Sequence, residues 1–440
     1  MAGRGDGGRV TPLSWNRYPR VKPLRVAKLD FRHDPLPPLN GAPSRLAYGQ
    51  GRSYGDVCLN AGGLSLLTRG LDRFIAFDRA AGRLSAEAGV TLDELLTFLV
   101  PQGWFVPVTP GTRFVTLGGA VANDVHGKNH HRAGSFGHHV SELELLRSDG
   151  ERIVCGPERN REWFEATVGG LGLTGLITRV TIDLSRIANA FMITEGKRFR
   201  SLDEFWALNT EAERDWPYTA AWIDCLSAHG RGLQLAARHA PAHTALPLHR
   251  PRVRKFPLDP PISLVNALSL KAFNALYYRK PLPRGPALSP YEPYLYPLDA
   301  VLDWNRIYGR SGFFQYQCVL PPEASRAGVA QLLNGISRQG AGSFLAVLKT
   351  FGDAPSLGLL SFPRPGATLA LDFPNQGART ERLFVELDAI VADHSGALYP
   401  AKDARMSPEM FKRSFPNLPR FLPYVDPEFS SSFWRRVRER

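Results

Sequence analysis

The 440-residue sequence has few cysteines and no long apolar run. The cysteines form no C-x-x-C pair and are far apart, so we expect neither a zinc site nor a disulfide framework; they are Cys58, Cys155, Cys225 and Cys318. No run of about eighteen apolar residues is present, and therefore no transmembrane helix is predicted. The polar N-terminus has no continuous apolar stretch, so we expect no cleavable signal peptide.

Composition favours a folded protein with a ligand-binding cleft. Hydrophobic residues make up 43% of the chain and charged residues 22%, a balance typical of globular proteins. The length exceeds that of one ordinary core and suits two domains, between which ligands often bind. The net charge of +13 indicates an anionic partner. Nucleic acid, an anionic membrane surface and a phosphorylated substrate all remain open, as does a merely arginine-rich composition.

Two glycine-rich stretches have no apolar periodicity and are expected to be functional loops: "GQGRSYGD" at 49–56 and "GGAVANDVHGKNHHRAGSFG" at 118–137. The second contains His126, His130 and His131, which suggest a metal. However, Gly127 disfavours the helix that would align His126 with His130, and no H-E-x-x-H carboxylate is present, so no metal is predicted. Instead, glycines at 111, 118, 119 and 127 favour backbone amides converging on an anion.

A third glycine cluster, "GLGLTG" at 170–175, matches the dinucleotide pattern G-x-G-x-x-G. Helix-like "EWFEATV" precedes it and strand-like "LITRVTIDL" follows it, which is the reverse of the order that binds NAD. Nicotinamide binding is therefore not expected. Three separated glycine clusters suit a long ligand with a pyrophosphate at its middle, and FAD is the candidate; ordinary tight turns are the alternative.

Local patterns predict an α+β organisation. Strands are expected at 73–78 and 83–89, then a helix capped by Thr91 with Glu94, and a hairpin over 140–156. From about 190 to 394 the pattern changes, which indicates a second domain with its own sheet. Its expected strands are 218–227, 313–320 and 368–374, and its expected helix is 323–340.

The chain resembles the FAD-binding oxidoreductases of the vanillyl-alcohol-oxidase type, with a PCMH-type FAD-binding domain. The likeness rests on "GRSYGD", "PGTRFVTLGGAVANDVHGKNHHRAGSFGHHV", "ATVGGLGLTG", "PLDAVLDWNR", "FFQYQCVL", "LDFP" and "LYPAKDAR". It implies an α+β fold with a two-part FAD-binding domain, formed by residues 1–190 and a C-terminal return at 395–440. An inserted α+β substrate-binding domain occupies 191–394.

The resemblance also implies which residues contact FAD. Members that bond flavin covalently have a histidine where this chain has Arg52, so non-covalent FAD is expected. The implied cofactor contacts are Ala47, Tyr48, Gly49, Gln50, Gly51, Arg52, Ser53, Tyr54, Gly55, Asp56, Val57, Gly111, Thr116, Leu117, Gly118, Gly119, Asn123, Asp124, Val125, His126, Ile177 and Tyr399.

Within that family, the likeness is greatest to enzymes of lipid-linked pentose phosphates. The implied reaction is FAD-dependent oxidation of the ribose 2-hydroxyl of a polyprenylphosphoryl-β-D-ribose to the 2-keto sugar, the first half of epimerisation to an arabinan precursor. Lys402 and Tyr54 are the expected proton-transfer residues, while His126 is either a flavin contact or a satisfied loop histidine. Ala370 stands where mycobacterial relatives have cysteine, so no thiol takes part. The expected substrate-binding residues are Lys128, Tyr296, Gln315, Gln317, Lys349 and Lys402.

The partners follow from the same likeness. A separate NADH-dependent short-chain reductase is expected to reduce the keto sugar, and the location is expected to be cytoplasmic or peripheral at the inner membrane. Residues 249–284 predict a flap on the membrane surface, with a core helix as the alternative; the relevant side chains are Leu264, Leu268, Leu276, Arg250, Arg252, Arg254, Lys255, Arg279, Lys280 and Arg284. The rivals are an oxidase of a soluble sugar, alditol or lactone and a non-catalytic nucleic-acid-binding protein.

Overall fold

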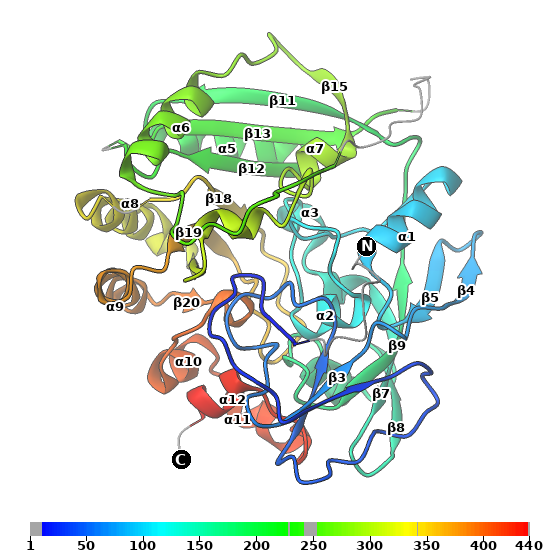
Figure 1. The fold of residues 1–440 in the computed structure, drawn as a ribbon. Helices are drawn as coiled ribbons and strands as arrows, with labels where there is room; N and C mark the ends of the chain where they lie inside the picture. Colours follow the sequence, from blue (N-terminus) through cyan, green and yellow to red (C-terminus); the bar gives the residue numbers. More distant parts are fainter. Residues whose placement is uncertain (1–10, 228, 242–252, 341, 439–440) are drawn as a thin grey trace.

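The computed structural model describes residues 11–227, 229–241, 253–340 and 342–438 (Figure 1). Arg250 and Arg252, which were expected to belong to the flap, lie outside the described residues. Two large antiparallel sheets and a small parallel one organise the chain. Apart from two small strand pairs, the strands up to residue 183 build the small parallel sheet and one large sheet, and the strands from residue 191 build the other large sheet.

The first large sheet has the strand order β4-β5-β9-β7-β8. A helix, α1 (Leu92–Leu99), buries its four leucines in the core of this sheet. The strands are β4 (Phe74–Asp78), β5 (Arg83–Glu87), β7 (Val140–Leu146), β8 (Arg152–Cys155) and β9 (Leu176–Asp183). The parallel sheet has the order β1-β3-β2 and shares a small core with β7 and β9; its strands are β1 (Arg25–Lys28), β2 (Arg45–Tyr48) and β3 (Leu64–Leu67).

The second large sheet has eight antiparallel strands in the order β15-β11-β13-β12-β18-β19-β17-β20. Helices α8 (Pro322–Arg338) and α9 (Ala378–Asp393) pack against its β17 and β19 half, where they bury the largest apolar core (Figure 1). The strands are β11 (Phe191–Phe199), β12 (Tyr218–Ile223), β13 (Gly232–His239), β15 (Ala287–Pro290), β17 (Phe313–Leu320), β18 (Ala346–Phe351), β19 (Gly366–Pro374) and β20 (Ala397–Leu398).

Shorter elements connect the sheets. Two small pairs are β6 (Trp104–Phe105) with β10 (Ser185–Arg186) and β14 (Arg254–Lys255) with β16 (Val301–Leu302). The other helices are α2 (Leu117–Ala122), α3 (His130–Ala133), α4 (Arg161–Thr167), α5 (Leu202–Asp215), α6 (Ala267–Arg279), α7 (Tyr291–Leu295), α10 (Pro408–Ser414), α11 (Leu418–Phe421) and α12 (Ser432–Val437). The 3-10 turns are η1 (Val100–Gln102), η2 (Phe136–His139), η3 (Trp304–Tyr308), η4 (Pro400–Lys402) and η5 (Leu422–Tyr424).

Most elements predicted from local patterns are confirmed. Thr91 caps α1, and the Glu94 side chain returns a hydrogen bond to the Thr91 backbone, as the capping-box pattern requires. Strands β4, β5, β7, β8, β12, β17 and β19 and helix α8 lie where they were expected. Around "GLGLTG", α4 precedes the glycines and β9 follows them. This order confirms that the motif does not open a helix toward a dinucleotide.

The C-terminal residues join the two halves of the fold. Strand β20 pairs with β17 and so extends the eight-stranded sheet just beyond residue 394. Farther along, the guanidinium of Arg436 on α12 is 2.6 Å from Asp56 and 3.0 Å from Asp403. This bridge links the tail to the glycine-rich loop after β2. Since both carboxylates are largely buried, loss of Arg436 would leave two unpaired buried acids, which is strongly destabilising.

Candidate active site

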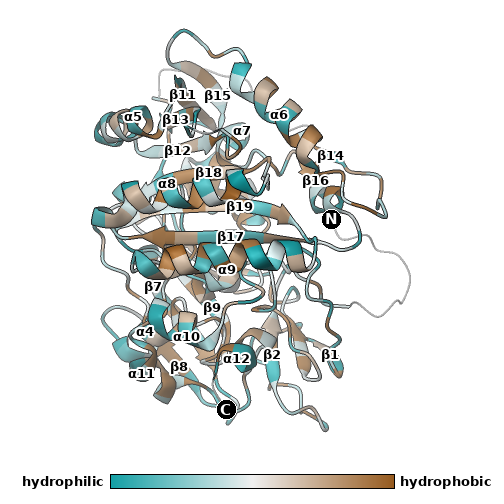
Figure 2. Cartoon of the chain, turned by 90° about the vertical axis from the view of Figure 1, so that its left-hand side faces the viewer, coloured by the Kyte–Doolittle hydropathy of each residue, from teal (hydrophilic) through white to brown (hydrophobic). Residues whose placement is uncertain are grey.

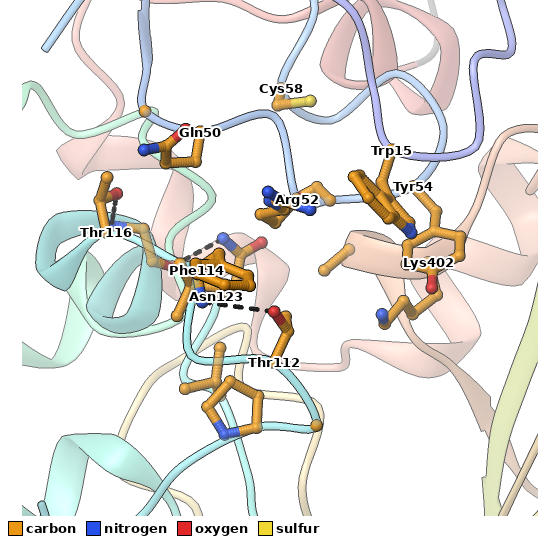
Figure 3. A pocket seen from close by; sticks show the side chains of 18 of the residues that line it. Trp15, Gln50, Arg52, Tyr54, Cys58, Thr112, Phe114, Thr116, Asn123 and Lys402 are labelled. Carbon is orange, nitrogen blue, oxygen red and sulfur yellow. Dashed lines mark hydrogen bonds between the residues drawn. The ribbon is translucent and has the colours of Figure 1, made fainter. Parts of the chain in front are cut away.

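The main cavity lies between the two halves of the fold. Its lining comes from the loop after β2, the loop before α2, the turn before β9, strands β17, β18 and β19, and the segment at 399–402 (Figure 3). Most of the expected side chains line it: Ala47, Gly49, Gln50, Gly51, Arg52, Ser53, Tyr54, Val57, Gly111, Thr116, Gly118, Gly119, Asn123, Val125, His126, Lys128, Ile177, Gln315, Gln317, Lys349, Tyr399 and Lys402.

The loop after β2 presents unpaired backbone amides to this cavity. None of the N–H groups from Gly49 to Ser53 donates to another residue in the described part of the chain. Gly51 has φ +59°, a left-handed conformation that glycine adopts without strain. At Gly55, a side chain is excluded because a Cβ would lie 1.7 Å from the Asp403 carbonyl oxygen. Such a run of free amides is a concave donor surface suited to phosphate oxygens.

The second glycine loop contributes differently from what the sequence predicted. Gly118 donates its N–H to the Ala88 carbonyl at 2.8 Å, and Gly119 donates to the Thr116 hydroxyl at 3.2 Å. These amides are occupied within the protein, so the expected anion nest at 118–119 is wrong. Close packing favours glycine at position 118, because a Cβ there would lie 3.0 Å from the Ala88 Cβ. By contrast, a Cβ on Gly111 would meet only open space.

Arg52 is held by aromatic rings in the middle of the cavity. Its guanidinium carbon lies 4.1 Å from the Trp15 ring centre and 5.2 Å from that of Phe114 (Figure 3). Cation–π contacts of this kind hold a buried cation at a fixed orientation. Its Nε is buried without a hydrogen-bond partner in the protein, and burial lowers its pKa. Arg52 is therefore positioned to donate to a bound ligand.

Lys402 and Tyr54 meet at the end of the cavity that lies away from Gln50 and Thr116 (Figure 3). The Lys402 Nζ lies 3.8 Å from the Tyr54 ring centre (Figure 3). Burial lowers the pKa of Lys402 to about 8, which brings its neutral form within reach near physiological pH. Burial raises the pKa of the Tyr54 phenol well above its usual value. Lys402 is thus suited to accept a proton, whereas Tyr54 stays protonated and offers its O–H as a hydrogen-bond donor.

Asp372, which sequence reasoning missed, lies behind this pair. It is fully buried on β19, and its Oδ1 accepts a hydrogen bond from Gln315 Nε2 at 2.6 Å. Its Oδ2 has no hydrogen-bond partner in the described part of the chain. Burial raises its pKa to about 7, and the positive field of Lys402 opposes that rise. The "LDFP" motif included this acid, and a carboxylate in an otherwise apolar strand was the signal that could have identified it.

Two more lysines line the cavity. Lys349 on β18 donates to the Gly127 carbonyl at 3.1 Å, and Lys128 donates to the Tyr294 carbonyl. Burial lowers the pKa of Lys349 to about 7, with further lowering from Lys128 and Lys402. Burial likewise lowers the pKa of Lys128 to about 8. Lysines that repel one another in a cavity favour an anion, because its charge removes the repulsion.

His126 is a neutral side chain at this site. Its Nε2 lies 3.1 Å from the amide nitrogen of Gln317, which donates, so the ring proton lies on Nδ1. That Nδ1 is buried and has no protein partner. Burial lowers the pKa of His126 well below its usual value. His126 therefore offers a hydrogen-bond donor to a ligand and does not carry charge.

Six expected site residues do not line the cavity. Their polar groups are engaged within the protein: Asp124 accepts from Gly137 at 2.9 Å and from Ser361 at 2.6 Å, and the Tyr296 hydroxyl lies 2.7 Å from that of Thr109. These six residues support the loops that form the cavity wall. They are Tyr48, Gly55, Asp56, Leu117, Asp124 and Tyr296. Lining residues that the sequence did not single out include Trp15, Thr112, Phe114, Leu298, Asp299, Trp304 and Thr368.

The metal alternative receives no support from the described residues. No group of three or more potential metal ligands occurs among them, and all four cysteines are free. His126 lies outside α3, which begins at His130, so the two histidines do not share a helix face.

The cavity fits FAD. The free amides of 49–53 and the unpartnered Arg52 Nε are donors for phosphate oxygens, and the unpartnered Oδ1 of Asn123 is an acceptor. Gly111 leaves open space where a side chain would intrude. Residues 44–156 match the model of the "FAD binding domain" family.

Similar proteins point the same way. A decaprenylphosphoryl-β-D-ribose oxidase of Mycolicibacterium smegmatis is 38% identical over 416 residues, which is 89% of this chain and 89% of that protein. An uncharacterised protein of Streptomyces coelicolor is 35% identical over 79% of this chain and its own whole length. A putative D-arabinono-1,4-lactone oxidase of Neurospora crassa is 29% identical over only 30% of this chain and 24% of that protein.

Proposed function

Since the chain belongs to the family of decaprenylphosphoryl-β-D-ribose oxidases, we propose that it oxidises the ribose 2-hydroxyl of a polyprenylphosphoryl-β-D-ribose to the ketone. It is an FAD-dependent oxidoreductase. The observation that carries the substrate proposal is the set of three half-buried lysines that line the cavity and interact electrostatically, Lys128, Lys349 and Lys402. A phosphorylated sugar supplies the negative charge that such a set lacks.

FAD, when bound, supplies the two-electron acceptor for the hydride that leaves the ribose C2. Lys402 in its neutral form accepts the proton of the 2-hydroxyl as the C2–H bond breaks, which leaves a C=O bond at C2. Tyr54, held protonated by burial, donates a hydrogen bond to the same oxygen. The carboxylate of Asp372 stabilises the positive charge that develops on Lys402, because it raises the pKa of this lysine through their electrostatic interaction.

We assign the binding of the substrate phosphate to Lys128 and Lys349. Both ammonium groups donate to backbone carbonyls, and each has further N–H donors for an anion. Gln317, which contacts His126, and Gln315, which contacts Asp372, present amides to the sugar hydroxyls. The ribose is thereby fixed between a phosphate clamp and a proton acceptor, which is the positioning that lowers the entropy cost of reaction.

FAD binding is proposed to be non-covalent. Arg52 stands where covalent relatives have histidine, and a guanidinium does not form the flavin bond. Return of the keto sugar to arabinose requires a reductant, and the helix–glycine–strand order at 161–183 excludes the dinucleotide motif at that place. A separate NADH-dependent short-chain reductase is the proposed partner for that step.

The test is product identification with a substrate panel. The purified holoprotein is mixed with polyprenylphosphoryl-β-D-ribose and an artificial electron acceptor, and the product is analysed by mass spectrometry. The proposal predicts loss of two hydrogens from the lipid-linked sugar. Oxidation of free ribose, alditols or lactones in preference to the phosphorylated sugar would support the soluble-substrate alternative instead.

A further inference from the structure

We propose that the segment around α6 docks on a lipid bilayer with anionic headgroups and so brings the cavity mouth to the membrane surface. The proposal rests on the proposed function, because that function gives the enzyme a substrate with a prenyl chain. The docking surface consists of an apolar ridge, defined as Ile262, Leu264, Leu268 and Leu276, and the cations around it.

The ridge is apolar and is left uncovered by the residues that the structure describes. Ile262 is 74% exposed, Leu264 48%, Leu268 79% and Leu276 74%. On α6, Leu268, Ala272 and Leu276 recur every four residues and therefore share one face. Figure 2 shows α6 at the margin of the molecule, with β14 and β16 next to it. Large apolar side chains gathered in this way mark an interaction surface.

The opposite face of α6 is anchored to the protein. Leu270 and Asn274 are buried, and the Asn274 amide donates to Asp224 at 2.7 Å. Phe273 makes an edge contact with Phe344, with ring centres 4.8 Å apart. The helix therefore packs through one face and turns the leucines of its other face outward, as the expected surface segment requires.

The positive charge around the ridge favours an anionic bilayer as its binding partner. Between residues 253 and 286 the chain has six lysines and arginines and one acid, Asp259. Asp259 is paired with Arg17 at 2.6 Å, so its charge is already compensated. The cations Arg254, Lys255, Lys271, Arg279 and Arg284 are exposed. Apolar side chains flanked by cations are the pattern by which amphipathic helices bind anionic membranes. No helix in the described ranges is long and apolar enough to cross a membrane.

The docking surface is continuous with the cavity mouth. Strand β14 pairs with β16, and both residues of β16, Val301 and Leu302, line the cavity. Just before α6, Leu264 donates its N–H to the Ile307 carbonyl, and Val265 packs in one cluster with Tyr54 and Trp304. A prenyl chain leaving the cavity would therefore enter the bilayer directly beside the ridge.

The test is flotation of the FAD-loaded protein with vesicles, in the absence of any substrate. One vesicle type contains phosphatidylcholine alone, and the other also contains phosphatidylglycerol. We expect stronger binding to the anionic vesicles at low salt. Leu268→Gln combined with Leu276→Gln should weaken binding at least about tenfold, since each leucine loses its apolar transfer free energy. Lys271→Gln and Arg279→Gln should each weaken binding to anionic vesicles about fivefold.

Matched controls lie elsewhere on the surface. Val385, 62% exposed on α9, is changed to Gln as the apolar control, and exposed Arg382 and Arg413 are changed to Gln as charge controls. These variants should bind like the parent. Failure of the parent to bind anionic vesicles would overturn the proposal, as would equal loss in the controls. A dimer that disappears in the leucine variant, without vesicle binding by the parent, would assign the ridge to a second copy of the chain.

Because no substrate is present, this experiment does not depend on the reaction. A protein that binds vesicles but fails to oxidise the lipid-linked sugar would contradict the proposed function alone. A protein that oxidises the sugar but ignores anionic vesicles would contradict the docking surface alone.

Discussion

The ammonium nitrogen of Lys402 lies 3.8 Å from the centre of the Tyr54 ring, and both side chains line the same cavity. The ring face and the carboxylate of Asp372 favour the protonated lysine, whereas burial favours the neutral one. Burial prevails, so the pKa of Lys402 falls to about 8 and the side chain can exchange a proton. This balance is the basis of the proposed chemistry.

Replacing Lys402 by Met should slow substrate-driven flavin reduction by about 100-fold or more, the usual scale for loss of a positioned proton-transfer group. FAD should remain bound, and substrate affinity should change less. The rates are compared by anaerobic stopped-flow absorbance at saturating substrate. Exposed Lys28, changed to Met, is the matched control and should reduce like the parent. Parental rates in Lys402→Met would exclude this lysine from the reaction.

The reduction rate should increase with pH and level off above about pH 8, where Lys402 is neutral. Asp372→Asn removes the negative field that raises the pKa of Lys402, so the midpoint should move to lower pH. A purely structural role for Asp372 would lower the rate or the stability without moving the midpoint. The pH profiles of the two proteins therefore distinguish positioning from folding.

Lys349 should show a trade-off between stability and ligand binding. Its pKa is lowered to about 7 in the folded state, so between pH 7 and its unfolded value of 10.5 the unfolded chain binds more protons. The cost of burying this lysine is complete below pH 7 and disappears as the pH rises to 10.5. Lys349→Met should therefore raise the melting temperature of the ligand-free protein at pH 7. A lower melting temperature would show that its bond to Gly127 outweighs burial.

The same lysine should make phosphate binding pH-dependent. An anion favours protonated Lys349 and Lys128, so affinity for ribose 5-phosphate should be full below about pH 7 and decline as the pH rises through 7 to 8. Calorimetry in buffers of different ionisation enthalpy should detect proton uptake on binding. Lys349→Gln should weaken binding about tenfold, the scale of one charged hydrogen bond. Neutral ribose is the control, and its affinity should not follow this pH dependence.

FAD should leave the polypeptide when the protein is denatured, because Arg52 provides no histidyl attachment. Acid precipitation should release the flavin absorbance into the supernatant. Free FAD at about 100 times its Kd should stabilise the folded protein by about 2.7 kcal/mol, so removal of FAD should lower the melting temperature. Flavin that stays with the precipitated chain would contradict non-covalent binding.

Local chemistry explains what the sequence could predict. Thr91 and Glu94 form a capping box within four residues, and α4 and β9 flank "GLGLTG" in an order visible in the letters. Most of the residues that the glycine clusters and motifs singled out do line the cavity. The sequence did not predict Asp372 as a site residue, because it comes close to Lys402 only when β19 and the turn after β20 come together in the fold. The hydrogen bond of the Gly118 N–H could not be predicted either, since its acceptor, the Ala88 carbonyl, is far away in the sequence.

The outward leucines of α6 show a second limit. A period of four in leucine and alanine is typical of both a buried and an exposed helix face, and the letters cannot say which face the protein covers. The contacts of Asn274 and Phe273 show which face is covered, because they hold that face against residues Asp224 and Phe344.

In the proposed reaction, hydride leaves C2 of a phosphorylated ribose in this cavity. Anaerobic flavin bleaching with polyprenylphosphoryl-β-D-ribose deuterated at C2 tests it most directly. We expect bleaching that is several-fold slower than with the unlabelled sugar, while deuterium at C3 should leave the rate unchanged. Bleaching that is insensitive to the C2 label but slowed by the C3 label, or absent with this substrate while a soluble sugar bleaches the flavin, would contradict it.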